Sequence, residues 1–405
     1  MDGKGIFEGV KILEFGQIVA GPLISTYLAD YGAEVIHVES KNRPDQYRLY
    51  PPFKDNKPGI NRGYDFAIYS HNKYGITLNL RNPKGAEVAK RLVKNWANVV
   101  TENFTPGVMK RQGLGYEELK KIKEDLIMLG TCNLGQTGPY AQHPGMGSHL
   151  THLSGFTHLT GWPDRDPLIL YGPYIDFIGV VYGTLALVGA LEYRRRTGKG
   201  QYIDVAQFEG GVQYLIPTLL DYVVNKRVQG RNGNRCDYAA PHAAFPCKGK
   251  DRWCVIAVFT DDEWKKLCQV MGDPAWSKDS KFNTLMGRKK NEEELEKLIG
   301  EWTSKFTPDE VVAKLQPAGV EAGVVKNPKE MYEDPHLNRY LWAEMTHPEI
   351  GKYHLELPSF RFSKVPPQLR MSGPLIGEHN EHVYRKLAGF SKEEYEQLNK
   401  EGVFE

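Results

Sequence analysis

The segment VKILEFGQIVAGPLISTYLADYGAEVIHVES, residues 10–40, determines the expected fold. Residues 10–16 have the apolar composition of a buried strand, and residues 34–40 alternate in polarity as a second strand would. Between them, Pro22 suits the first turn of a helix that would end near Gly32. A strand, a helix and a strand this close together predict a βαβ unit within a parallel sheet.

The same alternation of strands and helices continues to about residue 132. Further elements are expected as strands at residues 75–80, 97–104 and 126–132 and as helices after Asn82 and near 116–125. This order predicts an α/β fold with a Rossmann-like, doubly wound large domain. The turn from Gly16 to Pro22 lacks the G-x-G-x-x-G pattern, so a nicotinamide dehydrogenase is not expected. The sequence also lacks the usual motifs of P-loop proteins, HExxH metalloproteases and serine hydrolases.

Changes in composition indicate a second, smaller domain. The polar, glycine-rich segment 227–236 marks a boundary. A hairpin within residues 244–258 and helices near 261–271, 291–304 and 308–317 predict a small α+β domain. A linker at 328–367 would then lead to a C-terminal helix near 380–400.

We therefore expect the large domain to begin with residues 1–226 and the small domain to comprise residues 237–327. Residues 328–405 would form a linker and the return to the large domain. Residues 41–74 show little periodicity, and a loop of that length in a compact domain is usually functional.

The overall composition is that of an ordinary globular protein. The chain has 405 residues with 52 basic and 50 acidic side chains, so its charge does not suggest binding to nucleic acid or to an anionic membrane. The five cysteines are odd in number and form no CxxC pair, which favours a reduced, cytoplasmic compartment and no structural zinc. The sequence starts without the features of a signal peptide.

Asp176 immediately precedes fifteen residues without formal charge, 177–191. We expect this run to be a buried helix rather than a membrane span, since it is shorter than about 18 residues and contains three glycines. Gly198 is placed to end that helix. A carboxylate at the edge of such a run is partly desolvated, so Asp176 either caps the helix or takes part in chemistry.

Four histidines lie close together in the sequence, at positions 143, 149, 152 and 158. No acidic residue accompanies them at metal-ligand spacing, so no metal site is expected.

Six segments, in this order, resemble the class III CoA-transferases, the family that includes formyl-CoA transferase and carnitine CoA-transferase. They are LEFGQIVAGPLISTYLADYGAEVIHVES, NKYGITLNLRNPKG, VTENFTPGVMKRQGLGYEEL, GQTGPYA, the stretch from Asp176 to RRRTGKGQYIDV, and PLIGEHNEHV. The resemblance implies a Rossmann-like large domain built from both chain ends, an inserted small domain, and an interlocked dimer of two such chains.

The resemblance also implies which residues contact coenzyme A. They are Val19, Ala20, Leu78, Asn79, Leu80, Arg81, Asn103, Phe104, Thr105, Arg111, His143, Pro144, Gly145 and Met146. Formyl-CoA transferase has a basic residue where this chain has Ser40, so one phosphate contact is missing from the pattern. Coenzyme A enters as substrate, and no permanently bound cofactor or metal is implied.

The resemblance assigns the catalytic role to Asp176, which lies 21 residues before Thr197 in the RTGKGQ segment, as the family's aspartate does. It implies transfer of CoA from an acyl-CoA, with succinyl-CoA one candidate, to a carboxylic acid through an aspartyl mixed anhydride and an aspartyl-CoA thioester.

Two alternatives remain open. The related acyl-CoA racemases use a His-Asp pair where this chain has Met146 and Gly147, so one alternative is a racemase that lacks that imidazole. The transferases usually carry an acid in the same place, which Gly147 lacks as well. The second alternative is therefore a CoA-binding, non-catalytic subunit of a heteromeric transferase. In general, the chain is expected to pair either with a second copy of itself or with a related subunit.

Overall fold

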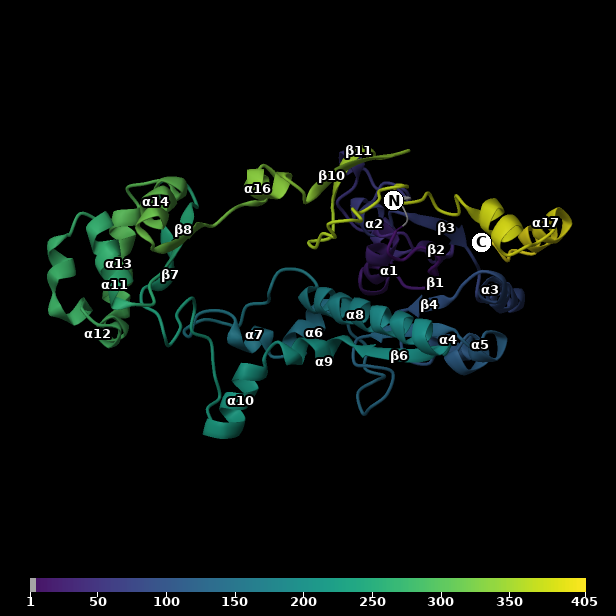
Figure 1. The fold of residues 1–405 in the computed structure, drawn as a ribbon, viewed down its shortest axis with the longest axis horizontal. Coiled ribbons are helices and arrows are strands. Elements are labelled where there is room, and N and C mark those ends of the chain that lie inside the picture. The colour runs from purple at the N-terminus through teal and green to yellow at the C-terminus, as the bar shows by residue number, and fades with distance from the viewer. Residues whose placement is uncertain (1–4) are drawn as a thin grey trace. The chain divides into compact units, whose positions relative to one another are not determined.

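The computed structural model describes residues 5–405, which form two compact units (Figure 1). The large unit contains the chain up to Thr157 together with Ile169–Val228 and Arg339–Glu405, and the small unit contains His158–Leu168 and Gln229–Asn338. The large unit is thus built from both ends of the chain. The domain limits expected from the sequence, which place the small domain at 237–327, remain a prediction. These limits are distinct from the bounds of the two compact units.

A six-stranded parallel sheet organises the large unit, with strand order β3-β2-β1-β4-β5-β6. The strands are β1 (Lys11–Glu14), β2 (Glu34–Glu39), β3 (Lys73–Thr77), β4 (Val99–Glu102), β5 (Ile127–Cys132) and β6 (Gln201–Ala206). The predicted βαβ unit is confirmed, because α1 (Ala20–Asp30) connects β1 to its parallel neighbour β2. The strand order reverses between β1 and β4, and such a point in an open α/β sheet is where ligands commonly bind.

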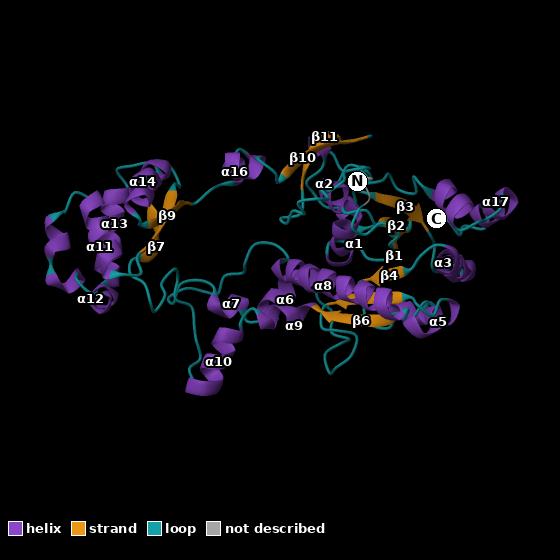
Figure 2. Ribbon diagram, viewed as in Figure 1, coloured by secondary structure: helices purple, strands orange, loops and turns teal. Residues whose placement is uncertain are grey.

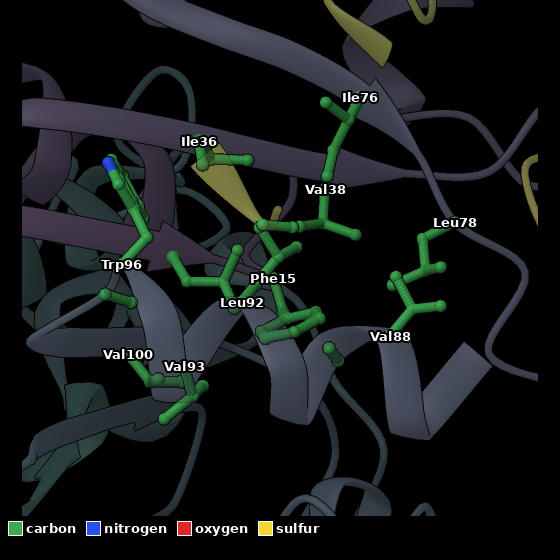
Figure 3. Close-up of a cluster of buried hydrophobic side chains, with 14 of the residues drawn as sticks. Phe15, Ile36, Val38, Ile76, Leu78, Val88, Leu92, Val93, Trp96 and Val100 are labelled. Atoms are coloured by element: carbon green, nitrogen blue, oxygen red, sulfur yellow. The ribbon is translucent and has the colours of Figure 1, made fainter. Parts of the chain in front are cut away.

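Side chains of the strands pack alternately into two cores. Ile12 and Val35 face one core with residues of α1 and of α8 (Tyr174–Thr197). Leu13 and Ile36 face the other core, which includes α3 (Pro83–Asn95) and the C-terminal segment. Figure 3 shows this second core. Helices therefore cover both faces of the sheet, as buried parallel strands require.

Several shorter helices complete the large unit. They are α2 (Tyr64–Tyr69), α4 (Val108–Arg111), α5 (Tyr116–Ile122), α6 (Gly147–Leu153), α9 (Gln207–Gln213), α10 (Ile216–Asn225) and α17 (Lys392–Lys400). Helix α7 (Phe156–Leu159) spans the change from one unit to the other.

The small unit contains a three-stranded antiparallel sheet of β7 (His242–Pro246), β8 (Trp253–Ala257) and β9 (Glu321–Val324). Its helices are α11 (Asp261–Val270), α12 (Leu285–Lys290), α13 (Glu292–Thr303), α14 (Pro308–Leu315), α15 (Pro328–Tyr332) and α16 (Pro335–Asn338). The predicted hairpin and the three predicted helices are present. Strand β9 was not predicted, because its four residues show no clear alternation of polarity.

Three sequence predictions outside the sheet were wrong in detail. The expected loop at 41–74 contains α2, and the expected linker contains the hairpin of β10 (Trp342–His347) and β11 (Gly351–Glu356). This hairpin buries only a few side chains against α2, so its polarity pattern resembles that of a linker. The expected C-terminal helix is broken: a π-helical turn precedes Gly389, whose φ is 75°, and α17 starts afresh from a capping box at Ser391.

Helix α8 lies along the sheet of the large unit (Figure 2). It ends at Gly198, whose φ of 71° terminates the helix as the sequence predicts. The expected burial of its apolar run is only partial in the single chain, because apolar side chains remain exposed on one side, with Leu185 68% exposed. Helix α8 is long and apolar enough to cross a membrane, contrary to the sequence prediction. The core helix of a soluble protein can have the same length and composition.

Candidate active site

Asp176 is the third residue of α8, and the residue before the helix is Pro173, which has no side chain able to cap it. Asp176 is therefore a first-turn residue and not the cap that the sequence left open. A carboxylate in the first turn is favoured by the partial positive charge of the helix N-terminus. Burial nevertheless raises the pKa of Asp176 to about 7. At neutral pH the group is thus divided between a poorly hydrated carboxylate and its acid.

Gly147, the first residue of α6, provides the space for this carboxylate. A Cβ atom at position 147 would lie 2.5 Å from Asp176 Oδ2 and 2.7 Å from the Cβ of Pro173. Real side chains do not tolerate such distances, so the absence of a side chain at Gly147 and the position of Asp176 depend on each other. An acidic side chain at this position, which the resemblance would imply and this chain lacks, would occupy the space that Asp176 fills.

A cavity of about 250 Å³ opens beside Asp176. Its walls include nine residues of the predicted site: Val19, Ala20, Asn103, Phe104, Thr105, His143, Pro144, Gly145 and Met146. Most of these wall residues lie in the segments that follow the carboxyl ends of β1, β4 and β5, and the strand order reverses between β1 and β4. The structure therefore brings most of the predicted residues to the edge of the sheet at which α/β proteins bind ligands.

A second cavity, of about 530 Å³, shares Phe104 and Thr105 with the first. The predicted residues Leu78, Asn79, Leu80 and Arg81 line it, together with Ser40 and Arg43. Arg111 lines neither of these cavities and is exposed at the end of α4. The structure thus places thirteen of the fourteen predicted contact residues on two adjoining cavities, nine on the first and four on the second, and leaves Arg111 outside.

The side chain of Asn103 is already engaged by the protein. Its Oδ1 accepts a hydrogen bond from the backbone N–H of Gln17 at 2.8 Å, and its Nδ2 donates to the carbonyl of Gln17 at 2.7 Å. Asn103 therefore joins the loop after β4 to the turn after β1. Gly16 and Gly21 allow this contact, because a Cβ at either position would lie within 3.5 Å of the Asn103 amide.

Sequence reasoning missed several residues of the smaller cavity, including Ile18, Cys132, Asn133, Gly147 and Gln207. Gln207 is 3% exposed, and a Cβ at Gly179, one turn after Asp176, would lie 2.8 Å from its Cγ. Cys132 ends β5 and Gln207 follows β6, so their position at the carboxyl end of a strand was the signal that could have identified them.

The loop GQTGPYA is anchored at its first polar residue. The backbone N–H of Gln136 donates to both carboxylate oxygens of Asp204, at 3.0 and 3.1 Å, and its Nε2 donates to Glu102 at 3.2 Å. The loop continues to Ala141, which lines the cavity beside Asp176. Within residues 5–405, no group of three or more His, Cys, Asp and Glu side chains has an arrangement that could hold a metal ion.

A profile of CoA-transferase family III matches residues 7–380. The chain belongs to this family. The resemblance noted in the sequence is thereby confirmed, and the protein is an enzyme of the CoA-transferase type.

Relatives of this family III CoA-transferase align over almost its whole length. It is 32% identical to succinyl-CoA–D-citramalate CoA-transferase of Chloroflexus aurantiacus, over 98% of this chain and 97% of the relative. It is 30% identical to succinyl-CoA:glutarate CoA-transferase of Mus musculus, over 100% of this chain and 91% of the relative. A crystal structure of a CaiB/BaiF family protein from Brucella suis matches with a TM-score of 0.86 and 30% identity, covering 95% of this chain and all of that one.

Proposed function

We propose that this enzyme transfers CoA from an acyl-CoA to a carboxylic acid, with Asp176 as the nucleophile. The observation that carries the proposal is the carboxylate of Asp176 on the wall of a cavity that adjoins a larger one. A desolvated carboxylate is more nucleophilic than a hydrated one, and its pKa of about 7 leaves enough of it ionised at neutral pH.

The reaction balances without metal or nucleotide. The Asp176 carboxylate attacks the thioester carbonyl and expels CoA thiolate, which leaves a mixed anhydride. The thiolate then attacks the aspartyl carbonyl, which releases the first acid and forms an aspartyl-CoA thioester. The acceptor carboxylate then attacks the aspartyl-CoA thioester, which expels CoA thiolate and forms a second mixed anhydride. The thiolate attacks the acceptor carbonyl of this anhydride, which forms the new acyl-CoA and regenerates Asp176 with one oxygen from the acceptor.

The sizes of the two cavities support a division of the substrate between them. The larger cavity, of about 530 Å³, suits the nucleotide part of CoA, and the smaller one beside Asp176 suits the thioester. Arg43 and Arg81 line the larger cavity and would meet phosphate groups there. Arg43 lies three residues after Ser40, so we assign it the contact that the family's basic residue makes. The predicted contact of Arg111 stays a prediction.

The names of the relatives support succinyl-CoA as the donor, since both use succinyl-CoA with a dicarboxylic acid. We therefore propose a dicarboxylate of similar size as the acceptor. The decisive assay mixes the enzyme with succinyl-, acetyl- or butyryl-CoA and a panel of mono- and dicarboxylates and follows the new thioester by chromatography. Faster transfer from succinyl-CoA to a dicarboxylate than to any monocarboxylate supports the proposal, and faster transfer to monocarboxylates contradicts it.

We also propose that two chains associate, as an interlocked dimer with a Rossmann-like large domain. The strand order 3-2-1-4-5-6 supports the Rossmann-like description. Helix α10 has no buried residue although it carries Leu219, Leu220, Val223 and Val224, and α8 is apolar on its exposed side. Apolar surface of this extent on a soluble enzyme normally meets another chain.

The five cysteines form no disulfide, in keeping with a reduced, cytoplasmic compartment.

Two observations keep alternatives testable. His143 lines the Asp176 cavity, so an imidazole is present for α-proton transfer in a racemase. Exchange of the α-proton with deuterated water, without transfer to an acceptor acid, would favour that reaction.

Two relatives are named as the alpha and beta subunits of a succinyl-CoA–L-malate CoA-transferase. Binding of CoA without turnover until a related chain is added would favour a heteromeric enzyme.

A further inference from the structure

Ile18 has a backbone conformation that β-branched residues seldom adopt. Its φ of 67° lies in the left-handed region, where the Cβ of any residue other than glycine is crowded by the backbone. The residue lies in the turn between β1 and α1 and lines the cavity beside Asp176. Such a strained conformation persists only where surrounding contacts hold it.

Asp45 supplies the contact that holds Ile18. The backbone N–H of Ile18 donates to Asp45 Oδ2 at 2.9 Å, and the backbone N–H of Tyr47 donates to Oδ1 at 2.8 Å. Asp45 is 1% exposed. Each oxygen of this buried carboxylate thus accepts one backbone hydrogen bond, and one of the two fixes the turn.

Asp45 ends a buried chain of ionisable side chains that crosses three strands. His37 Nε2 lies 3.9 Å from Asp45 Oδ2, and His37 Nδ1 lies 2.7 Å from Glu14 Oε1. The ammonium group of Lys73 donates to the same Glu14 oxygen at 3.0 Å. Although burial by itself raises the pKa of Glu14, Lys73 and His37 together hold that pKa below its ordinary value.

The other end of this chain contacts the first turn of α1, directly after the turn that contains Ile18. Lys73 Nζ donates to the carbonyl of Pro22 in α1 at 2.8 Å, so hydrogen bonds reach the chain at Ile18, before α1, and at Pro22, inside its first turn. Val19 and Ala20, which lie between these two attachment points, line the Asp176 cavity. The position of that cavity wall therefore depends on both ends of the network.

The ion pair of Glu39 and Arg48 also contacts Asp45. The backbone N–H of Asp45 donates to Glu39 at 3.2 Å, and Arg48 Nη2 lies 2.7 Å from Glu39 Oε1. Burial raises the pKa of Asp45 to about 6, against the lowering effects of His37 and of the two backbone donors. At pH 7 and above the carboxylate is therefore mainly ionised and can accept both bonds.

We propose that Asp45 is a positioning residue for the transfer reaction: it keeps Ile18 in the left-handed conformation and so fixes Val19 and Ala20 opposite Asp176. The inference rests on the proposed function, because it takes attack by Asp176 as the step that needs this wall. Small displacements of groups that orient a reacting carbonyl lower the rate of attack strongly.

The test begins with Asp45→Asn. The amide keeps the size of the side chain but replaces one acceptor by a donor that faces a backbone N–H. We expect the rate of Asp176 acylation by acyl-CoA to fall about tenfold or more, with a smaller change in CoA affinity. Adding Ile18→Gly should recover most of that loss, because glycine adopts a positive φ without strain. A role of Asp45 in general stability alone would not be relieved by glycine at position 18.

Asp30→Asn is the matched control. Asp30 is also a buried carboxyl of the large unit, and it accepts hydrogen bonds from His71 and Asn72 at 2.8 Å, away from the turn. This variant should lose stability comparably but keep its acylation rate, and Ile18→Gly should not improve it.

Amide hydrogen exchange of the peptide 15–24 gives a readout that needs no activity. Asp45→Asn should accelerate exchange in that peptide, and Asp30→Asn should not. Unchanged exchange, an unchanged acylation rate in Asp45→Asn, or no recovery with Ile18→Gly would overturn the proposal. If wild-type Asp176 is never acylated, the proposed function fails instead, and the exchange result still decides whether Asp45 holds the turn.

Discussion

The carboxylate of Asp176 occupies the space that a side chain at Gly147 would fill, with Oδ2 2.5 Å from the ideal Cβ position. The Asp176 carboxylate and the start of α6 are therefore packed closely together, and Pro173 leaves no space on its side. A glycine that looked like a missing acid in the sequence is, in the structure, a condition for the position of the proposed catalytic group.

Gly147→Ala should displace the Asp176 carboxylate and lower kcat by about tenfold to a hundredfold, since small misplacements of a reacting group are costly. Measured KM for acyl-CoA should change less, because the larger cavity is untouched. Gly300→Ala is the control: its Cβ would come no closer than 3.6 Å to Pro246, an ordinary contact. Equal kcat in Gly147→Ala and wild type would refute the close packing of Asp176.

Asp176→Asn should remove activity and at the same time stabilise the fold at pH 8. The folded-state pKa of about 7 exceeds the ordinary value of 3.8, so the folded protein holds this proton more tightly than the unfolded chain does. The wild type therefore loses stability as the pH rises from about 4 to about 7. The amide avoids a cost on the order of 1 to 4 kcal/mol, with partial exposure favouring the lower values. Denaturant titrations at pH 5 and pH 8 check this, and a variant less stable than wild type at pH 8 would contradict it.

The same raised pKa gives the acylation step a pH dependence. The attacking group is the carboxylate, so the rate of Asp176 acylation should rise with pH and level off above about pH 7, because burial raises the pKa of Asp176 to about 7. Single-turnover release of the donor acid from acyl-CoA, followed from pH 5 to pH 9, measures this. A rate that is flat down to pH 5 would show that Asp176 has an ordinary pKa in the free enzyme.

Arg43→Ala should raise KM for acyl-CoA about tenfold, through loss of a charge-assisted phosphate contact, and leave kcat nearly unchanged. Arg111→Ala is a paired variant, because the structure places Arg111 outside both cavities. A larger effect at Arg111 than at Arg43 would favour the family pattern over the geometry of this chain.

Leu220→Glu should weaken association of the proposed dimer, because Leu220 is 55% exposed on α10, none of whose residues is buried in the single chain. Lys226→Glu, at the end of the same helix, controls for the added charge. Light scattering after gel filtration measures the mass. A wild-type enzyme that is monomeric at micromolar concentration would contradict the proposed dimer.

Much of the large unit could be predicted from local patterns. The strands around 10–16 and 34–40 are recognisable because buried parallel strands are apolar and turn residues separate them from helices. Asp176 could be found from its place before a long uncharged run. Gly147 and Ile18 could not, since their roles depend on contacts between segments far apart in the sequence: α6 with α8, and the first turn with Asp45. The hairpin β10–β11 escaped because it buries only a few side chains.

The measurement that tests covalent catalysis by Asp176 most directly uses an acceptor acid labelled with oxygen-18 in its carboxylate. Each complete turnover in the proposed mechanism moves one acceptor oxygen onto Asp176, so the peptide containing Asp176 should become heavier while all other peptides stay unlabelled. Mass spectrometry after many turnovers in ordinary water reads this out. Full turnover with no label in the Asp176 peptide would show that the acceptor never forms an anhydride with Asp176.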